Sequence, residues 1–261
     1  MKAYSFFSVA VFTAIISTFS CSSADDGNDN AGGGGNSSPS GGGGGSSNSA
    51  VSCPVSAVSS NSVTCGGETY QTVVIGSQTW FAKNLNYAVE GSKCYDNNLA
   101  NCVTYGRLYD WATAMALPSS CNSDNCSSRI QAKHRGICPN GWHIPSDADW
   151  DVLMDAVGDH SVAGDKLKAT SGWYNNVFAY DGSGTDDYDF SALPGGYGWS
   201  GYSGSSDVSF VYAGDRGYWW SSTGSMDNVS AYSRYMSYEG DHVLSGSDFK
   251  YSLYSVRCLK D

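Results

Sequence analysis

The sequence predicts an α+β domain with two helices, an antiparallel sheet and several disulfide bonds. Apolar residues make up 41% of the 261 residues, which is enough for a core, and 32 glycines against 6 prolines favour tight turns between short strands. One stretch repeats apolar residues with helical spacing. The nine cysteines indicate an exported protein with disulfide bonds.

A hairpin pattern predicts the first strands of the domain. Residues 70–75 are rich in β-branched side chains and precede a glycine, and a second apolar stretch follows over 78–82. The polar residues 83–104 are expected to form a loop, and 105–117 a short strand that leads into a helix. Beyond residue 173, turn residues separate further short antiparallel strands, expected at 190–196, 208–212, 218–222, 230–238 and 252–258.

The clearest helix signal follows Pro145. Ser146 stands at an N-cap position with Asp149 three residues later, which is the spacing of a capping box. An apolar stripe then continues until Gly158 and consists of Trp150, Leu153, Met154 and Val157. A second short helix is expected over 162–169.

Residues 1–20 have the pattern of an export signal. Lys2 precedes an uncharged, mostly apolar run over residues 3–19. The following Cys21 resembles the cysteine of a bacterial lipobox, whose thiol takes a lipid anchor with chains such as palmitate, and by the same resemblance Ser22 directs the lipoprotein to the outer membrane. The alternative is an ordinary secretory signal with an unpaired cysteine, because Phe19 stands where the lipobox prefers a small residue.

Composition changes sharply after the signal. Residues 21–50 are rich in glycine and serine and are expected to form a flexible tether, whereas residues 51–261 are expected to form the folded domain. The formal net charge is −11 and no basic cluster is present, so nucleic acid is not an expected partner. The membrane is expected to be a partner through the lipid anchor, with the domain at the cell surface.

Eight cysteines remain when Cys21 is set aside. An even number fits a complete disulfide framework, although eight cysteines allow 105 connectivities. Pairing of sequence neighbours gives one hypothesis: Cys53 with Cys65, Cys94 with Cys102, Cys121 with Cys126, and Cys138 with Cys258. Zinc is the alternative, but no CxxC motif is present and the four histidines are scattered.

Seven runs in order give the chain a family resemblance over roughly residues 65–261. The sequence resembles the Fibrobacter succinogenes major paralogous domain, a family found on exported and lipid-anchored bacterial proteins. The matching runs are Ile75–Trp80, Lys83–Tyr87, Tyr105–Trp111, Cys138–Ser146, Phe190–Gly196, Tyr218–Thr223 and Ser255–Cys258.

The resemblance implies a fold but no biochemical activity. The family is similar to the C-type-lectin-like and formylglycine-generating-enzyme-like folds, which implies two helices, a twisted antiparallel sheet and chain ends that lie close together. Close chain ends agree with a Cys138–Cys258 disulfide.

Catalysis is not expected. An enzyme of the formylglycine-generating kind needs a pair of redox-competent cysteines in its late strands, and residues 218–250 contain none. A degenerate enzyme of that kind is a lesser alternative. Hydrolysis of glycosides needs two carboxylates that flank the bond, and no spacing marks such a pair. His143, between two apolar residues, is expected to be a packed side chain and not a base.

One acidic segment is a candidate for structural calcium binding. The sugar-binding triplets of calcium lectins are absent, but Asp181, Asp186, Asp187 and Asp189 lie in an acidic segment with the oxygen ligands that calcium prefers. The segment fails the EF-hand pattern because its sixth position is Asp186 and not glycine. The other interpretation is a solvated acidic loop, and no cofactor is expected.

Metal-free carbohydrate binding is the favoured function. Eight tryptophans and 18 tyrosines are more than a domain of this size needs for its core, and aromatic rings can stack on sugar rings. The candidate ligand-binding residues are Tyr197, Trp199, Tyr202, Tyr218 and Trp219. Glycines around the first three suggest an exposed turn, and alternation places one ring of the Trp219-Trp220 pair outside the core.

The sequence therefore predicts a non-catalytic surface lipoprotein that binds extracellular polysaccharide, such as that of the plant cell wall. Two other interpretations stay open: these rings belong to the core, or the domain is a structural scaffold that binds protein.

Overall fold

The computed structural model describes residues 52–175, 181–201 and 207–261. The chain divides at residue 46, and all the described residues belong to the second unit, Ser47–Asp261. Cys21, the expected signal over 1–20 and the expected tether over 21–50 lie outside the described residues, as does Tyr202.

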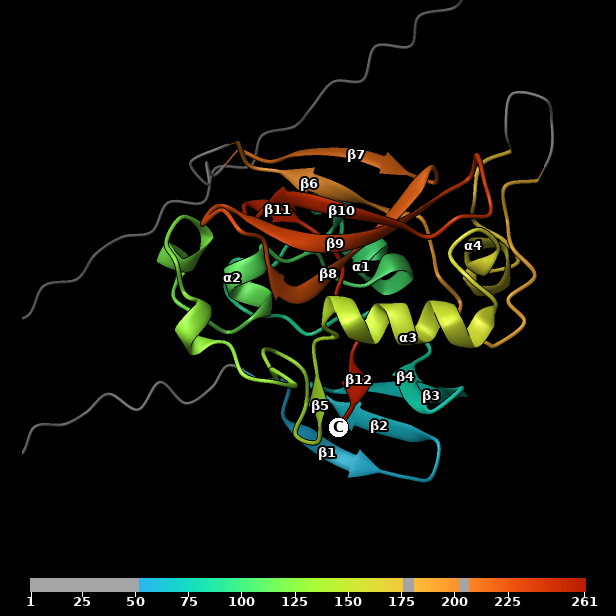
Figure 1. The fold of residues 1–261 in the computed structure, drawn as a ribbon, viewed down its shortest axis with the longest axis horizontal. Coiled ribbons are helices and arrows are strands. Elements are labelled where there is room, and N and C mark those ends of the chain that lie inside the picture. The colour runs from blue at the N-terminus through green and yellow to red at the C-terminus, as the bar shows by residue number, and fades with distance from the viewer. Residues whose placement is uncertain (1–51, 176–180, 202–206) are drawn as a thin grey trace, which may run out of the picture. The chain divides into compact units, whose positions relative to one another are not determined.

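Two sheets dominate this unit (Figure 1). All strand pairs of the first sheet are antiparallel. Its strands, in spatial order, are β1 (Val55–Val58), β2 (Ser62–Cys65), β3 (Glu68–Ile75), β4 (Gln78–Phe81), β12 (Leu259–Lys260) and β5 (Trp142–His143). The hairpin predicted over 70–82 is confirmed as β3 and β4.

The second sheet is mixed, because β6 runs parallel to β8 while the other pairs are antiparallel. Its spatial order is β10 (Leu244–Phe249), β9 (Ser230–Ser237), β8 (Arg216–Gly224), β6 (Gly195–Trp199) and β11 (Ser252–Leu253), and β7 (Ser209–Ala213) also pairs with β6. The expectation of purely antiparallel late strands is therefore wrong at β6 and β8.

Helices are short in the described part of the chain. They are α1 (Leu99–Tyr105), α2 (Trp111–Ala114), α3 (Asp147–Val157) and α4 (Ala163–Leu167), with the 3-10 segments η1 (Tyr95–Asn97), η2 (Ser119–Asn122) and η3 (Ser127–Arg129). The two helices expected over 146–158 and 162–169 are confirmed as α3 and α4. The expected loop over 83–104 contains most of α1, whose N-cap Asn98 accepts a hydrogen bond from the backbone N–H of Ala100.

The predicted fold class is wrong. We expected an α+β, C-type-lectin-like domain, whereas the structure is mainly β, with two curled sheets and four short α-helices in the described residues. The physical reason is that only α3, with 11 residues, has an apolar stripe long enough to fill the space between the sheets. Strands supply much of the rest of the core, with smaller contributions from α2 and α4.

The helix α3 lies between the two sheets (Figure 1). Its capping box is confirmed: the Ser146 hydroxyl accepts a hydrogen bond from the Asp149 N–H, and the Asp149 carboxylate accepts one from the Ser146 N–H. The predicted stripe is buried, and it packs with Trp80 of the first sheet and Trp219 of the second in one core cluster. One amphipathic helix therefore joins both sheets.

A second core cluster lies on the other side of β8. Trp220 belongs to it, together with Phe81 of the first sheet and Trp111 of α2. Both neighbouring tryptophans, Trp219 and Trp220, are 0% exposed. The expectation that one of these rings lies outside is wrong, because both faces of β8 are covered by core.

The structure confirms the four disulfides of the sequence hypothesis: Cys53–Cys65, Cys94–Cys102, Cys121–Cys126 and Cys138–Cys258. The last one joins residues 120 apart in sequence. Among the described residues, no helix is both long and apolar enough to cross a membrane.

Candidate functional site

The structure does not arrange the described aromatic candidates for sugar stacking as one exposed platform. Tyr197 and Trp199 are half-buried in β6, which is an inner strand and not an exposed turn. The glycines there allow close packing: a Cβ at Gly196 would lie 2.4 Å from the Val211 carbonyl oxygen, and one at Gly198 would lie 2.9 Å from Leu253. These glycines indicate close strand contacts and not turns.

Trp219 cannot contribute to a surface platform. Its ring is 0% exposed, and its indole N–H donates a hydrogen bond of 2.8 Å to the Asn84 side-chain oxygen. This candidate is therefore a core residue. Tyr218 is also buried, at 8% exposure.

A row of stacked tyrosines crosses the second sheet and ends at its surface. Tyr218 stacks on Tyr254 with ring centroids 5.0 Å apart, and on Tyr235 with centroids 5.4 Å apart. Tyr197 meets the Tyr218 ring edge-on at 5.1 Å. Burial raises the pKa of the Tyr218 and Tyr254 hydroxyls, so these rings stay uncharged. Both faces of Tyr218 are covered, and Tyr235 is the outer ring of the row.

Tyr235 lines an open cavity of about 300 Å³, which we call the hollow. The hollow is formed by β8, β9, the start of β10 and the segment between these last two strands. Its lining residues are Arg216, Tyr235, Ser237, Glu239, Gly240, His242 and Leu244. Glu239, His242 and Leu244 are exposed, and Arg216 and Tyr235 are half-buried. The hollow thus places one aromatic ring next to several exposed hydrogen-bonding groups.

Arg216 is held in place at the edge of the hollow. Its guanidinium lies 4.7 Å from the centroid of the Tyr212 ring, and its Nε lies 3.5 Å from Asp215 Oδ1. Burial raises the pKa of Asp215, while the charge of Arg216 partly opposes this change. Arg216 is therefore a preoriented donor.

The sequence does not single out any residue of the hollow as a binding residue. It predicts only the strand that carries Tyr235 and Ser237. Tyr235 is opposite Tyr218 in the β8–β9 register, and Leu244 is opposite Tyr235 in the β9–β10 register. The strand over 230–238 was predicted, but its pairing was not, and β10 was not predicted at all. A predicted register would have placed Tyr235 beside Tyr218.

The acidic candidates for calcium form hydrogen bonds with nearby serines or are exposed. The Asp181 carboxylate accepts a hydrogen bond from the Ser183 N–H, and Asp186 accepts bonds from the N–H and hydroxyl of Ser191. Asp187 and Asp189 are exposed. Within residues 52–175, 181–201 and 207–261, no group of three or more His, Cys, Asp or Glu side chains is placed to hold a metal ion.

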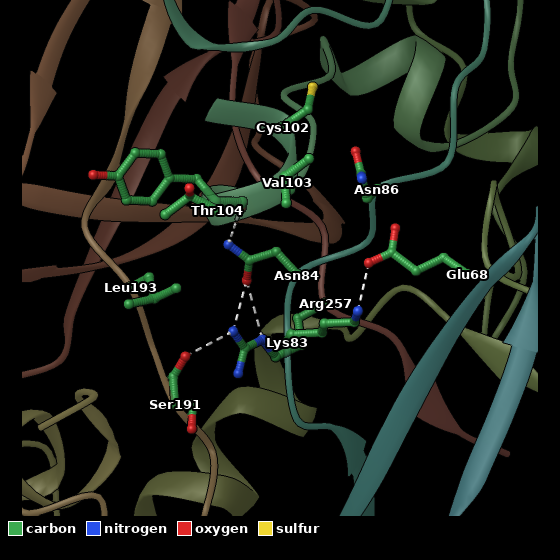
Figure 2. A pocket seen from close by; sticks show the side chains of 12 residues that line it. Glu68, Lys83, Asn84, Asn86, Cys102, Val103, Thr104, Ser191, Leu193 and Arg257 are labelled. Atoms are coloured by element: carbon green, nitrogen blue, oxygen red, sulfur yellow. Dashed lines mark hydrogen bonds and ion pairs between the residues drawn. The ribbon is translucent and has the colours of Figure 1, made fainter. Parts of the chain in front are cut away.

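A second polar cavity, shown in Figure 2, lies beside α1 and has a volume of only about 20 Å³. There Asn84 points toward the buried guanidinium of Arg257, whose Nη2 donates to the Asn84 side-chain oxygen at 2.7 Å. Arg257 also donates to the Phe190 carbonyl oxygen. Burial lowers the pKa of Arg257 to about 9, against the opposing effect of Asp186. This volume holds about one water molecule, so the cavity is no ligand site.

A sequence model described as the Fibrobacter succinogenes major domain matches residues 73–260. The chain belongs to this family. No curated protein and no solved structure gives a significant match.

In this Fibrobacter succinogenes major domain, the runs that carry the family resemblance meet inside the molecule. Asn84, Trp219 and Arg257 come from three of those runs and share one buried hydrogen-bond network. His143, from a fourth run, is 1% exposed, and its Nδ1 lies 2.8 Å from Asp261 Oδ1. It is a packed strand residue, as expected. All the lining residues of the hollow lie outside these runs.

Proposed function

We propose that this domain is a non-catalytic module that binds extracellular polysaccharide in the hollow. The observation that carries the proposal is the position of Tyr235, an aromatic ring beside Arg216, Ser237, Glu239 and His242. Apolar ring faces contact the C–H faces of sugars, while side chains such as these bond sugar hydroxyls. The hollow, at about 300 Å³, is at the lower end of the range for small-molecule sites and suits one part of a long chain.

The lining of the hollow favours binding over glycoside cleavage. Cleavage needs two carboxyl groups on either side of the bond, and Glu239 is the one lining residue with a carboxyl group. The neighbouring Asp215 is held beside Arg216. Polymers of plant cell walls, such as cellulose and xylan, are the ligands we propose to try first.

The same proposal places the domain at the outer membrane. Cys21 would carry a lipid anchor and residues 21–50 would form the tether, as the sequence predicts. Cys21→Ser removes the thiol that would be acylated, so we expect the protein to move from the detergent phase to the soluble fraction. Equal membrane retention of the two forms would contradict the anchor.

Polysaccharide binding can be tested with two tyrosines of one strand. Tyr235→Leu removes the ring from the hollow but keeps an apolar side chain, whereas Tyr232→Leu changes a half-buried tyrosine of β9 that does not line the hollow. We expect Tyr235→Leu to weaken binding to insoluble cellulose or xylan about tenfold, or about 1.4 kcal/mol, and Tyr232→Leu to leave binding unchanged.

The second candidate function is a protein-binding scaffold, which predicts a different result in the same assay. The exposed Tyr212 ring beside Arg216 would also suit a protein surface. A domain that binds none of the polymers but retains a protein control would overturn the polysaccharide proposal. Equal loss in both tyrosine variants would show that binding does not use the hollow.

A further inference from the structure

A buried lysine lies directly behind the hollow. Lys168 follows α4 and is 1% exposed, and its ammonium group donates hydrogen bonds to three backbone carbonyl oxygens. These are the oxygens of Gly182 at 2.8 Å, Gly240 at 3.1 Å and Ser237 at 3.3 Å. An ammonium group has three N–H donors, so its hydrogen-bonding capacity is fully used.

The three carbonyls belong to two segments that are far apart in sequence. Gly182 lies in the acidic segment that the sequence suggested for calcium, whereas Ser237 and Gly240 line the hollow. The same region has two further backbone bonds: Gly164 N–H donates to the Asp241 carbonyl at 2.7 Å, and Val243 N–H donates to that of His160 at 3.0 Å. Segment 237–243, one wall of the hollow, therefore depends on contacts from the α4 region.

The surroundings of Lys168 resemble a cation site more than a salt bridge. Backbone carbonyl oxygens, which surround the ammonium group here, are also ligands of hard metal ions such as calcium. Within the described part of the chain no carboxylate forms an ion pair with the ammonium group, but the charges of Asp241, Asp165 and Asp181 act on it. Burial lowers the pKa of Lys168, and these three carboxylates oppose that change. The Trp173 ring, whose centroid lies 5.3 Å from Nζ, completes the enclosure.

We propose that the Lys168 ammonium group takes the place of a structural metal ion and positions the 237–243 wall of the hollow. It joins the acidic segment to this wall, which is the role that a bound calcium ion would have. Lys168 is a positioning residue, since it does not line the hollow itself. The effect on the wall stands without the proposed function; only the effect on polysaccharide binding rests on it.

The neighbouring lysine provides a matched control. Lys168→Met keeps most of the length of the side chain but removes its charge and its three donors. Lys166→Met makes the same change two residues earlier, where the ammonium group donates to the Val157 carbonyl oxygen at 2.6 Å. The hydrogen bond of the Lys166 ammonium group therefore goes to α3 and not to segment 237–243.

Hydrogen exchange of the full domain measures the wall directly. We expect amide exchange over 237–243 and 182–185 to become at least about tenfold faster in Lys168→Met, with α3 and β4 unchanged, and no such change in Lys166→Met. Unchanged exchange at both segments in a folded Lys168→Met protein would overturn the proposal.

Two further measurements on the unaltered protein test the proposal if Lys168→Met does not fold. In the unaltered protein, we expect exchange over 237–243, corrected for its intrinsic pH dependence, to rise selectively at a pH below the ordinary lysine value of 10.5. Exchange that stays constant up to that value would contradict the proposal. EDTA should leave exchange at these segments unchanged, and a selective increase would show that a metal ion holds the wall instead.

Polysaccharide binding separates this inference from the proposed function. We expect Lys168→Met to bind insoluble xylan or cellulose at least about tenfold more weakly than Lys166→Met does. An unaltered domain that binds neither polymer would overturn the proposed function, while the exchange experiment would still decide the role of Lys168. Faster exchange with full binding would show that the wall does not determine affinity.

Discussion

The network around Asn84 and the hollow contain similar polar groups, but they use them in opposite ways. In the network, Asn84 accepts hydrogen bonds from Trp219 and Arg257, and all three side chains are buried. In the hollow, Arg216 is preoriented, and Glu239 is exposed to solvent. Residues of the first kind hold the fold together and those of the second kind are available to a ligand. The residues that carry the family resemblance therefore determine the fold, whereas the exposed groups available to a ligand lie outside them.

The largest expected effect concerns the disulfides. Cys138–Cys258 joins two family runs and closes a loop of 120 residues, whereas Cys121–Cys126 closes one of 5. If both cysteines of the long loop are replaced by alanine, we expect the free energy of unfolding to fall by about 5 kcal/mol, against about 2 kcal/mol for the short loop. Denaturant unfolding without reductant measures both values. Equal losses would mean that loop length does not set the contribution.

The next effect compares two aromatic residues of the second sheet. Trp219→Ala should lower the free energy of unfolding by about 4 kcal/mol, because it leaves a cavity in the core and removes a buried hydrogen bond. Tyr212→Ala should cost less than about 1 kcal/mol, since Tyr212 is 42% exposed. Thermal and denaturant unfolding of the two variants test the comparison. Similar costs would show that burial does not distinguish the two regions.

A smaller effect is expected for Asn84. Asn84→Ala leaves the buried Arg257 guanidinium and the Trp219 N–H without their shared acceptor, which should cost about 3 kcal/mol. The adjacent Lys83 pairs with Glu68 at the surface, so Lys83→Ala should cost less than about 1 kcal/mol. Unfolding in denaturant again gives both numbers. A mild Asn84→Ala variant would imply that the network is replaced by water.

The smallest expected effect is the dependence of stability on pH. Burial alone would raise the pKa of Asp149, but the nearby His143 ring and hydrogen bonds from Ser146 outweigh it and lower the pKa to about 2. Because this value lies below the 3.8 of an unperturbed Asp, the stabilisation is complete above about pH 4 and is lost as the pH falls toward 2.

Asp149→Asn provides the test of that pH dependence. At neutral pH we expect the free energy of unfolding of this variant to be about 1 kcal/mol lower than that of the unaltered protein, because the capping box is weakened. Its melting temperature should also change less between pH 4 and pH 2 than that of the unaltered protein. Identical acid profiles would assign this part of the pH dependence to other carboxyl groups.

The features that the sequence predicted correctly are local. The capping box at Ser146 and the stripe that ends at Val157 are encoded within one stretch of chain. The hairpin over 70–82 is encoded by β-branched residues and a turn glycine. The three short-range disulfides pair sequence neighbours, and the fourth used the two cysteines that were left.

The features that the sequence did not predict depend on partners far away in the chain. Gly196 and Gly198 indicated a turn, because glycine frees the backbone, but here they make room for neighbouring strands. Alternation placed one of Trp219 and Trp220 outside, but α3 and the first sheet cover both faces of β8. The hollow depends on the β8–β9 register, which no local pattern specifies.

The position of β12 determines when the first sheet can form during synthesis. Leu259 pairs with both Trp80 of β4 and His143 of β5, so in the first sheet these two strands meet through β12, which follows all the other described strands in sequence. The disulfide of Cys138 likewise cannot form until Cys258, 120 residues later, has been made. A growing chain that has not yet reached β12 therefore cannot join β4 to β5, and the first sheet is completed later than the hairpin of β3 and β4.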